Sequence, residues 1–221
     1  MIKSNIILDY ERLSRCGVEE AIFCESKTAT QINEIIVQSL AQNRRLLMTR
    51  INSNQFEQLT QTAKENITYY PNARCAVLGS LNAPCDSAKI AIVSGGSSDA
   101  PICYETQITL NYHHIACDLF QDVGVAAIWR LLDIADQLKT YDVIIAVAGM
   151  EAALPTVLAG LVDSPIIAVP TSVGYGVATG GHTALAACLA SCSGVMTMNI
   201  DNGYGAACSA IKIIRKINKK L

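Results

Sequence analysis

Three side chains in this 221-residue sequence stand where they could do chemistry: Asp99, Glu151 and Cys192. Each carboxylate follows an apolar run that ends in small residues, Asp99 in SGGSSDAP and Glu151 in AGMEA. A carboxylate placed there can act as a general acid or base, or bind a ribose or a metal ion. Cys192 precedes Ser193 and Gly194 after a helix-compatible segment, and a thiol at such a turn is a candidate nucleophile.

Each of these residues also has a structural explanation. Asp99 could cap the helix that follows it, and Glu151 could be a first-turn carboxylate that the helix dipole stabilises. Cys192 is one of nine cysteines, and most cysteines are packing residues rather than nucleophiles. Their number is odd and no CxxC pair is present, so we expect reduced thiols, as in a cytoplasmic protein.

Polar, glycine-rich loops supply the candidate binding residues. They follow apolar runs over residues 88–93, 143–147, 166–169 and 195–198. If these runs form a parallel sheet, the loops converge at its carboxyl edge, where open α/β sheets bind ligands. Glycines let the backbone approach a phosphate, and hydroxyls and helix N-termini donate hydrogen bonds to it. The candidate binding residues are Ser94, Gly95, Gly96, Ser97, Ser98, Asp99, Pro101, Gly149, Met150, Glu151, Thr171, Ser172, Gly174, Tyr175, Gly176, Gly180, Gly181, His182, Asn199, Asp201, Asn202 and Gly203.

None of these loops identifies its ligand by itself. The SGGSSD junction fits neither GxGxxG nor the phosphate-loop pattern, which argues against an ordinary nucleotide fold. Asp201, between two asparagines, is typical of a ligand-holding turn and of a plain turn. His182 could titrate near neutrality, although a lone histidine after two glycines is more often structural. His113, His114 and Cys117 lack a second ligand pair, so the metal, if any, is unknown.

Short apolar runs followed by helix-compatible segments predict βα units over residues 87–221. We therefore predict a three-layer α/β fold with a mainly parallel sheet in this part of the chain. Two long helices are predicted from apolar residues at helical spacing, over 124–138 and 204–220.

Residues 1–86 predict a small α+β domain, because they are richer in Gln, Asn, Glu and Arg and lack the strand–glycine pattern. A helix is predicted over 28–42, with Thr28 or Thr30 available as its N-cap. The other predicted elements are strands over 46–51 and 67–70 and a polar helix over 53–65.

Three arginines of this domain, Arg44, Arg45 and Arg50, could reach a phosphate. The simpler alternative for each is a solvated surface arginine, since arginines are mostly exposed.

Composition excludes several classes of protein. Charged residues are only 16%, against roughly a quarter in ordinary domains, which predicts burial of surface against other subunits. The net charge of −2 gives no electrostatic footprint for nucleic acid. No apolar stretch is long enough to span a bilayer. The first 13 residues lack the apolar core and cleavage site of a signal peptide, so we expect a cytoplasmic protein.

Four motifs occur in order over about residues 88 to 210: GGSSDAP, DVGVAAIWRLL, AGMEAALPTVLAGLVDSPIIAVPTSVGYG and CSGVMTMNIDNGYGAA. Together they resemble the LarB-type synthases of nickel-pincer nucleotide biosynthesis. The C-terminal domain of that family is similar to PurE-type carboxyaminoimidazole ribonucleotide mutase, in which a Gly-Ser-x-Ser-Asp loop and an Ala-Gly loop bind the nucleotide. The mutase's Ser-x-His-Arg-Thr loop, which supplies its catalytic histidine, is absent; the corresponding region reads HHIACDLFQDVGV.

The resemblance implies a PurE-like, flavodoxin- or Rossmann-like fold and a reaction on nicotinic acid adenine dinucleotide. The pyridinium ring is carboxylated at C5 with carbon dioxide or bicarbonate, and the phosphoanhydride is hydrolysed. The products are pyridinium-3,5-biscarboxylic acid mononucleotide and AMP, in cofactor synthesis for lactate racemase-type enzymes. Cys192 matches the family's nucleophilic cysteine, and Glu151 could remove the C5 proton or align the ring.

For cofactors and partners, we expect no tightly bound cofactor. The acidic, hydroxyl-rich loops suggest a divalent cation, Mg²⁺, at the diphosphate during cleavage. The low charge and the resemblance favour a homo-oligomer, an octamer rather than a dimer.

Two other functions stay open at the level of sequence. A PurE-like mutase or other nucleotide carboxylase would bind an aminoimidazole ribonucleotide instead of a pyridine dinucleotide. A non-catalytic nucleotide-binding module would bind the dinucleotide and release no AMP.

Overall fold

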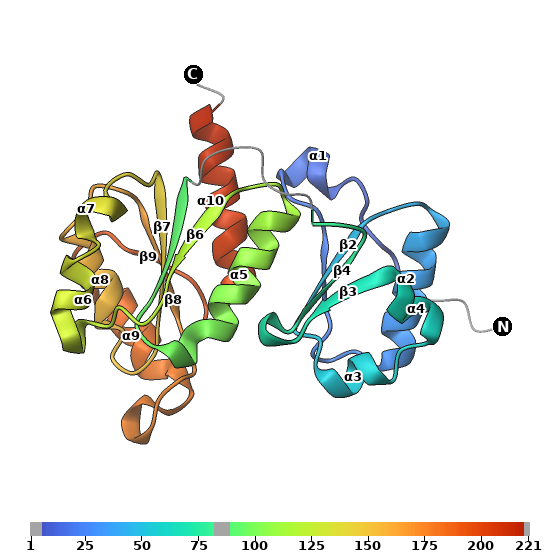
Figure 1. Cartoon of the computed structure of the whole chain (residues 1–221), viewed down its shortest axis with the longest axis horizontal. Coiled ribbons are helices and arrows are strands. Elements are labelled where there is room, and N and C mark those ends of the chain that lie inside the picture. Colours follow the sequence, from blue (N-terminus) through green and yellow to red (C-terminus); the bar gives the residue numbers. More distant parts are fainter. Residues whose placement is uncertain (1–5, 82–88, 219–221) are drawn as a thin grey trace. The chain divides into compact units, whose positions relative to one another are not determined.

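A computed structural model describes residues 6–81 and 89–218, and the chain forms two compact units, residues 1–82 and 83–221 (Figure 1). The predicted boundary between residues 86 and 87 lies outside the described residues. Cys85 and the predicted strand start at Ala88 also lie outside them.

The second unit contains a five-stranded sheet in the order β6-β5-β7-β8-β9, and every neighbouring pair is parallel. The strands are β5 (Ile90–Ser94), β6 (Cys117–Phe120), β7 (Val143–Ala148), β8 (Ile166–Pro170) and β9 (Met196–Thr197). All residues of β5, β7 and β8 are buried, as expected for parallel strands covered on both faces. The predicted three-layer α/β fold is confirmed.

Helices cover both faces of this sheet (Figure 1). Helices α5 (Ala100–Tyr112) and α10 (Gly203–Asn218) pack together on one face. The other face packs against apolar side chains of α6 (Ile128–Leu132), α7 (Ala135–Leu138), α8 (Ala153–Ala159) and α9 (His182–Ala190). Short 3₁₀ turns, η2 (Ser97–Asp99), η3 (Val125–Ala127) and η4 (Gly176–Gly181), lead into three of these helices. Within residues 6–81 and 89–218, no helix has the length and hydrophobicity to cross a membrane.

The helix predicted over 124–138 is wrong as a single element. The segment instead forms η3, α6 and α7, because the chain bends at Ile134, which has φ −110° and ψ 0°. Leu131 and Leu138 are buried in the core, whereas Ile128 and Leu132 of the predicted apolar face are 44% and 52% exposed. An apolar pattern at helical spacing therefore contained both core and surface positions.

The first unit has a four-stranded mixed sheet in the order β1-β2-β4-β3, in which only the β1–β2 pair is parallel. Its strands are β1 (Ala21–Phe23), β2 (Leu46–Thr49), β3 (Ile67–Tyr70) and β4 (Cys75–Leu78). Its helices are α1 (Arg12–Cys16), α2 (Ala29–Ala41), α3 (Ser53–Glu57) and α4 (Gln61–Asn66), with a 3₁₀ turn η1 (Pro71–Ala73). The predicted small α+β domain is thus present.

Helix α2 begins where the sequence predicts, and the predicted helix over 53–65 is two helices. The Thr28 hydroxyl accepts a hydrogen bond from the Gln31 N–H, and the Gln31 side chain accepts one from the Thr28 N–H, which makes a capping box. Between α3 and α4, the Thr60 hydroxyl caps the second helix by accepting from the Ala63 N–H at 3.3 Å. The Thr60 cap therefore starts a second helix inside the polar segment that was predicted to be one helix.

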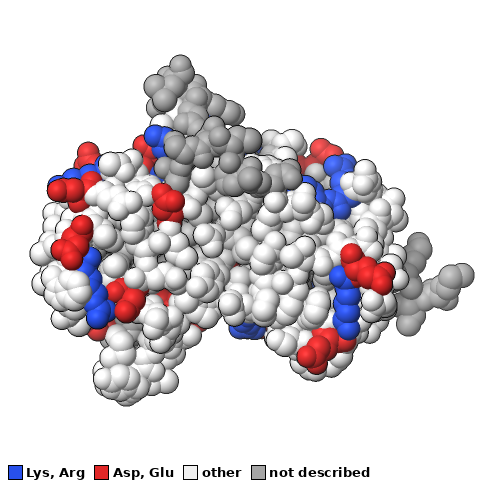
Figure 2. Space-filling view, in the orientation of Figure 1, with Lys and Arg blue, Asp and Glu red and all other residues white. Residues whose placement is uncertain are grey.

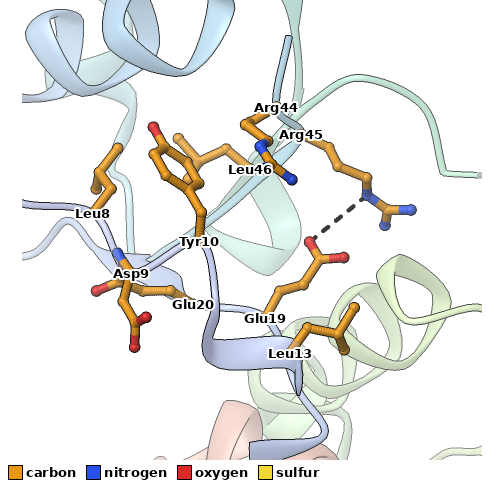
Figure 3. Close-up of a pocket in the computed structure, with 9 residues that line it drawn as sticks. All are labelled: Leu8, Asp9, Tyr10, Leu13, Glu19, Glu20, Arg44, Arg45 and Leu46. Carbon is orange, nitrogen blue, oxygen red and sulfur yellow. Dashed lines mark hydrogen bonds and ion pairs between the residues drawn. The ribbon is translucent and has the colours of Figure 1, made fainter. Parts of the chain in front are cut away.

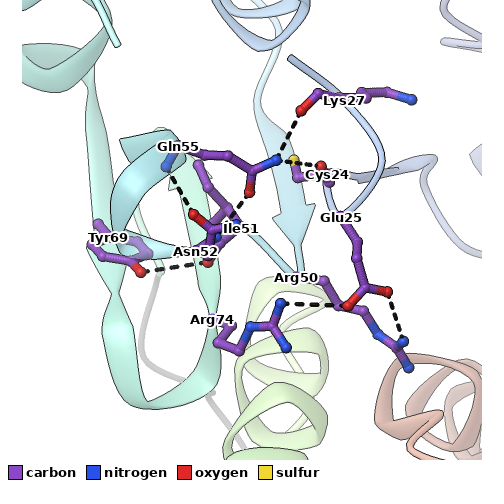
Figure 4. Close-up of polar contacts among 9 residues, drawn as sticks. All are labelled: Cys24, Glu25, Lys27, Arg50, Ile51, Asn52, Gln55, Tyr69 and Arg74. Carbon is purple, nitrogen blue, oxygen red and sulfur yellow. Dashed lines mark hydrogen bonds and ion pairs between the residues drawn. The ribbon is translucent and has the colours of Figure 1, made fainter. Parts of the chain in front are cut away.

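A buried glutamine fixes the loop after β1 (Figure 4). The Gln55 amide nitrogen Nε2 donates to the carbonyl oxygens of Cys24 at 2.7 Å and Lys27 at 2.8 Å. Its Oε1 accepts from the Asn52 N–H at 3.0 Å. Nearby, Glu25 accepts hydrogen bonds from Arg50 at 3.2 Å and Arg74 at 3.4 Å. Arg50 follows β2 and Arg74 precedes β4, so the loop also contacts the ends of these two strands.

Truncating Gln55 should therefore destabilise the first unit. Gln55→Ala removes the bonds to the Cys24 and Lys27 carbonyls, and the Cys24 carbonyl keeps its bond from the Lys27 N–H. Each lost hydrogen bond costs about 0.5–1.5 kcal/mol. Urea unfolding monitored by circular dichroism measures the loss. The matched control is Gln58→Ala, because Gln58 is exposed and only bonds Asn54 on the same helix. Equal effects of the two substitutions would contradict the assignment.

Candidate active site

A cavity of about 360 Å³ opens where β5 and β7 end. The loops after β5, β6 and β7 form most of its wall, and Val173 of the loop after β8 completes it. The predicted residues that line it are Gly95, Gly96, Ser98, Asp99, Gly149, Met150 and Glu151. The lining residues that the sequence did not single out are Gly124, Val125, Ala126, Ala148, Ala152, Ala153, Leu154 and Val173.

The loop after β5 is held close to its neighbours by the backbone. The Gly95 N–H donates to the Val147 carbonyl at 2.9 Å. A Cβ on Gly124 would lie 2.5 Å from the Gly95 carbonyl oxygen, so only glycine fits there. The buried Ser94 hydroxyl donates to the Gly96 carbonyl at 3.3 Å and accepts from the Asp122 N–H, which makes it a support of the loop. In the sequence, the glycine of DVGVAA could have indicated that the segment after β6 forms part of the cavity wall.

Asp99 is the most constrained candidate. Its side chain is 3% exposed, its Oδ1 accepts from the Thr171 hydroxyl at 2.7 Å, and its Oδ2 accepts from the Gly96 N–H at 3.0 Å. Burial raises the pKa of this carboxyl above its ordinary value. The two hydrogen bonds oppose that rise, and the charge of Asp201 adds to it. Asp99 therefore joins the ends of β5 and β8 beside the cavity.

The turn after β7 carries Glu151 on an unusual backbone. Met150 and Ala152, on either side, have φ values of +54° and +46°. Such left-handed residues other than glycine cost about 1–3 kcal/mol each and cluster at functional sites. A Cβ on Gly149 would overlap the Val173 carbonyl, so the turn presses against the loop after β8. Glu151 itself is exposed at the rim of the cavity.

The loops after β8 and β9 meet through Asp201. Its Oδ1 accepts from the Ser172 N–H at 2.8 Å, and its own N–H donates to the Pro170 carbonyl at 2.9 Å. Asp201 has a φ of +56°, so this is also a strained position. The structure thus brings Asp99, Thr171, Ser172 and Asp201 together along the carboxyl edge of the sheet.

Many predicted binding residues do not line the cavity. Among the described residues these are Ser94, Ser97, Pro101, Thr171, Ser172, Gly174, Tyr175, Gly176, Gly180, Gly181, His182, Asn199, Asp201, Asn202 and Gly203. Two of the glycines have packing reasons instead. A Cβ on Gly181 would lie 2.7 Å from the Thr171 carbonyl, and one on Gly203 would lie 2.9 Å from a Glu105 carboxylate oxygen.

Cys192 lies in the turn between α9 and β9 and, within the described part of the chain, is not a lining residue of the cavity. The Ser191 hydroxyl before it accepts from the Thr156 hydroxyl at 2.9 Å, which anchors the end of α9 to α8. Of the eight described cysteines, Cys192 alone is exposed. Exposure therefore favours it as the reactive thiol.

Burial makes several other thiols hard to ionise. It raises the pKa of Cys24, Cys103 and Cys117 to about 12 each, and it also raises the pKa of Cys188. A thiol that stays protonated is a poor nucleophile.

Substituting Asp99 tests whether burial controls this carboxyl. Because its folded-state pKa is raised, the folded state binds the proton more tightly than the unfolded chain. Its contribution to the free energy of unfolding therefore falls as pH rises from 3.8 through the raised pKa. Asparagine does not titrate. The free energy of unfolding of the native protein minus that of the Asp99→Asn variant should therefore decrease over this pH window. Urea unfolding at a series of pH values measures the difference.

Asp136 provides the control with the opposite sign. Its hydrogen bond to Lys139 lowers the pKa of the Asp136 carboxyl, so native stability relative to Asp136→Asn should rise slightly with pH. The effect is small because the pair is exposed. If native stability relative to Asp99→Asn also rose with pH, burial would not be the dominant influence on the pKa of Asp99.

Comparisons with known proteins identify the family of both parts of the chain. The family model described as AIR carboxylase matches residues 89–221, and the LarB/PurE-like N-terminal domain model matches residues 5–80. The chain is 34% identical over 228 residues to the uncharacterized protein MJ0165 of Methanocaldococcus jannaschii, covering 99% of this chain and 87% of that protein. It is 32% identical over 141 residues to the N5-carboxyaminoimidazole ribonucleotide mutase of the same organism, covering 60% of this chain and 85% of the mutase.

The two family matches fall on the two compact units in the expected order. The chain therefore belongs to the AIR carboxylase family and has the LarB-type architecture, a LarB/PurE-like N-terminal domain followed by a PurE-like α/β domain.

Proposed function

We propose that this protein converts nicotinic acid adenine dinucleotide, carbon dioxide or bicarbonate, and water to pyridinium-3,5-biscarboxylic acid mononucleotide and AMP. One observation carries the proposal. A LarB-type N-terminal domain precedes a PurE-like domain whose cavity has, among the described residues that line it, no histidine. The wall after β6, where the mutase would carry its histidine loop, is Gly124, Val125 and Ala126.

The second candidate is a PurE-like mutase or nucleotide carboxylase, which the 32% identity to the archaeal mutase favours. An acid–base reaction on an aminoimidazole ribonucleotide needs a proton-transfer group at the reacting carbon. On the cavity wall, Asp99 and Glu151 are the titratable groups among the described residues. Binding of an aminoimidazole ribonucleotide in preference to a pyridine dinucleotide would support this candidate.

The proposed chemistry needs a nucleophile that can also leave. A pyridinium C5 is electron-poor and does not attack carbon dioxide. Addition of the Cys192 thiolate to C4 gives a dihydropyridine, in which C5 is the β-carbon of an enamine and is nucleophilic. C5 then forms the new carbon–carbon bond to carbon dioxide. Loss of the C5 proton to a base and expulsion of the thiolate restore the aromatic ring, so the sequence of steps needs no oxidant.

Glu151 is our candidate for the base that takes the C5 proton. It is exposed at the cavity rim and lies between two left-handed residues that fix its backbone. Asp99 is buried with both oxygens engaged, so we assign it to holding the loops and orienting the nucleotide rather than to proton transfer.

Mass spectrometry after incubation with the dinucleotide and ¹³C-bicarbonate tests the proposal. The expected products are AMP and a mononucleotide that carries the label. Binding of the dinucleotide without AMP release would instead indicate a non-catalytic module, and turnover of an aminoimidazole ribonucleotide would indicate the mutase.

Cys192→Ser should fold and bind the dinucleotide but lose almost all carboxylation. The substitution replaces one atom of an exposed side chain, so the effect on stability should be small. A serine hydroxyl ionises too weakly to add to the ring, and its alkoxide leaves poorly. Label incorporation measures the loss. An adduct on the Cys192 peptide, trapped with an unreactive pyridine dinucleotide, would give independent support.

Cys188→Ala is the matched control, four residues earlier on α9. Cys188 is buried, so alanine is preferable to serine, which would place a hydroxyl in the core. This variant should keep most of its activity. Near-native carboxylation by Cys192→Ser would show that the covalent mechanism is wrong.

A divalent cation is the remaining part of the proposal. Within the described residues, no group of three His, Cys, Asp or Glu side chains could hold a metal by itself. Because both Asp99 oxygens are engaged, Asp201 at the carboxyl edge of the sheet is our candidate ligand, and Mg²⁺ is usually bound through one or two carboxylates and substrate phosphates. Bound there, Mg²⁺ would neutralise charge on the diphosphate. We therefore expect thorough chelation to reduce AMP release and added Mg²⁺ to restore it; undiminished release would exclude the cation.

We also propose a cytoplasmic homo-oligomer, with an octamer favoured over a dimer. Large apolar side chains are exposed on the second unit, including Trp129 at 61%, Tyr175 at 77% and Val177 at 93%. On the face shown in Figure 2, charged side chains form small separate groups and most of the surface is uncharged. Sedimentation at micromolar concentration should give an oligomer, and a stable monomer would contradict it.

A further inference from the structure

The first unit has a cavity of its own, of about 380 Å³, at the opposite ends of β2 and β4 from the loop that Gln55 fixes. Two leucines form its apolar part. The remaining lining residues are Asn43, Arg44, Arg45, Asn66, Gly79 and Ser80. They provide two guanidinium groups, two carboxamides and a hydroxyl, and no carboxylate belongs to the described residues that line this cavity.

The chain turns sharply to place the two arginines here. Helix α2 ends at Ala41, and Asn43 adopts a φ of +51°. The Asn43 N–H donates to the Leu40 carbonyl at 3.0 Å and the Arg44 N–H to the Ser39 carbonyl at 2.9 Å. These bonds close the end of the helix and occupy carbonyls that would otherwise repel an anion.

Gly79 forms the facing wall. It follows β4 with a φ of +94°, in the left-handed region that favours glycine. A Cβ at this position would lie 3.5 Å from the Arg45 Cβ, so the backbone after β4 passes beside that arginine.

Arg44 has no acidic partner among the described residues. Its guanidinium lies 5.3 Å from the centre of the Tyr10 ring, a cation–π contact that leaves its N–H groups available for hydrogen bonds. Arg45 lies 3.9 Å from Glu19 through its Nε, at the limit of an ion pair. Figure 3 shows the smaller adjoining pocket, of about 110 Å³, on whose wall both arginines also lie.

Three other arginines of this unit form ion pairs with carboxylates away from this cavity. Arg50 and Arg74 both contact Glu25, and Arg15 contacts Asp9. Asp9, Glu19 and Glu20 line the adjoining pocket, where Arg15 contacts Asp9 and Arg45 contacts Glu19. Arg44 is therefore the arginine that lies beside the carboxylate-free cavity without an acidic partner among the described residues.

We propose that this cavity binds a phosphate monoester with an uncharged body, such as a sugar phosphate or a nucleoside monophosphate. Guanidinium groups bind phosphate through paired, charge-assisted hydrogen bonds, and the carboxamides and hydroxyl can bond the ester's hydroxyl groups. A volume of about 380 Å³ is within the usual range for small-molecule sites. The proposal does not depend on the reaction proposed for the second unit.

Hydrogen–deuterium exchange of the full chain, read by mass spectrometry, can locate this binding. The probes are inorganic phosphate, ribose 5-phosphate and AMP. We expect ribose 5-phosphate, AMP or both to protect peptides that cover residues 40–46 and 78–81. Peptides that cover 95–99 and 149–152 report separately on the other cavity, so AMP bound there is distinguished from AMP bound here.

Arg44→Gln is the main variant, because it removes a charge without breaking an ion pair to any described residue. It should weaken the protecting ligand at least about tenfold, the effect of losing one charge-assisted contact. Arg74→Gln, in the same unit but outside the cavity, is the matched control and should bind normally. Arg44→Gln/Arg45→Gln should abolish protection.

Three results would overturn the proposal. One is an absence of protection with all three probes, and another is unchanged binding in the Arg44→Gln/Arg45→Gln variant. The third is protection by inorganic phosphate alone, which would identify an adventitious ion only.

Discussion

The arrangement of the candidate active site depends on one buried carboxylate. Asp99 accepts hydrogen bonds from Thr171 and from the Gly96 backbone, so it joins the loop after β5 to the end of β8 across β7. A charged group with 3% exposure would be costly without such partners, and its hydrogen bonds offset part of that cost. Since both oxygens are engaged, the loops on either side of the cavity are fixed relative to each other before any ligand arrives.

Close backbone contact is the second constraint at this edge of the sheet. Gly124 lies against Gly95, and Gly149 against Val173, at distances that leave no room for a side chain. The described lining has few polar side chains, those of Ser98, Asp99 and Glu151. Such a wall supplies little acid–base chemistry, which is consistent with the proposed reaction, since that reaction relies on a nucleophile from outside the wall.

The first unit shows a different distribution of polar groups. The bonds that Gln55 makes to Cys24 and Lys27, and the pair of Glu25 with Arg50, hold the loops after β1 and β2. At the other end of the same strands, Arg44 and Arg45 lie beside a cavity that lacks carboxylates among its described lining. Arg44 thus lies at the opposite end of the small sheet from the Glu25 pairs, so a ligand that binds Arg44 leaves those pairs intact.

The sequence by itself determined the class of fold, the family and the β5 and β7 loops of the site, because buried strands and glycine clusters are local patterns in the chain. It did not indicate β6, because the polar Asp118 interrupts that short strand's apolar pattern. It did not indicate the break at Ile134, because an apolar residue there continues the helical pattern. Only the tertiary structure decided that Gly124–Ala126 forms a cavity wall, that Asp99 contacts Thr171, and that Cys192 is exposed while Cys188 is buried. Each of these depends on contacts between residues far apart in the chain or on which side of a helix faces the core, and neither property is present in local spacing.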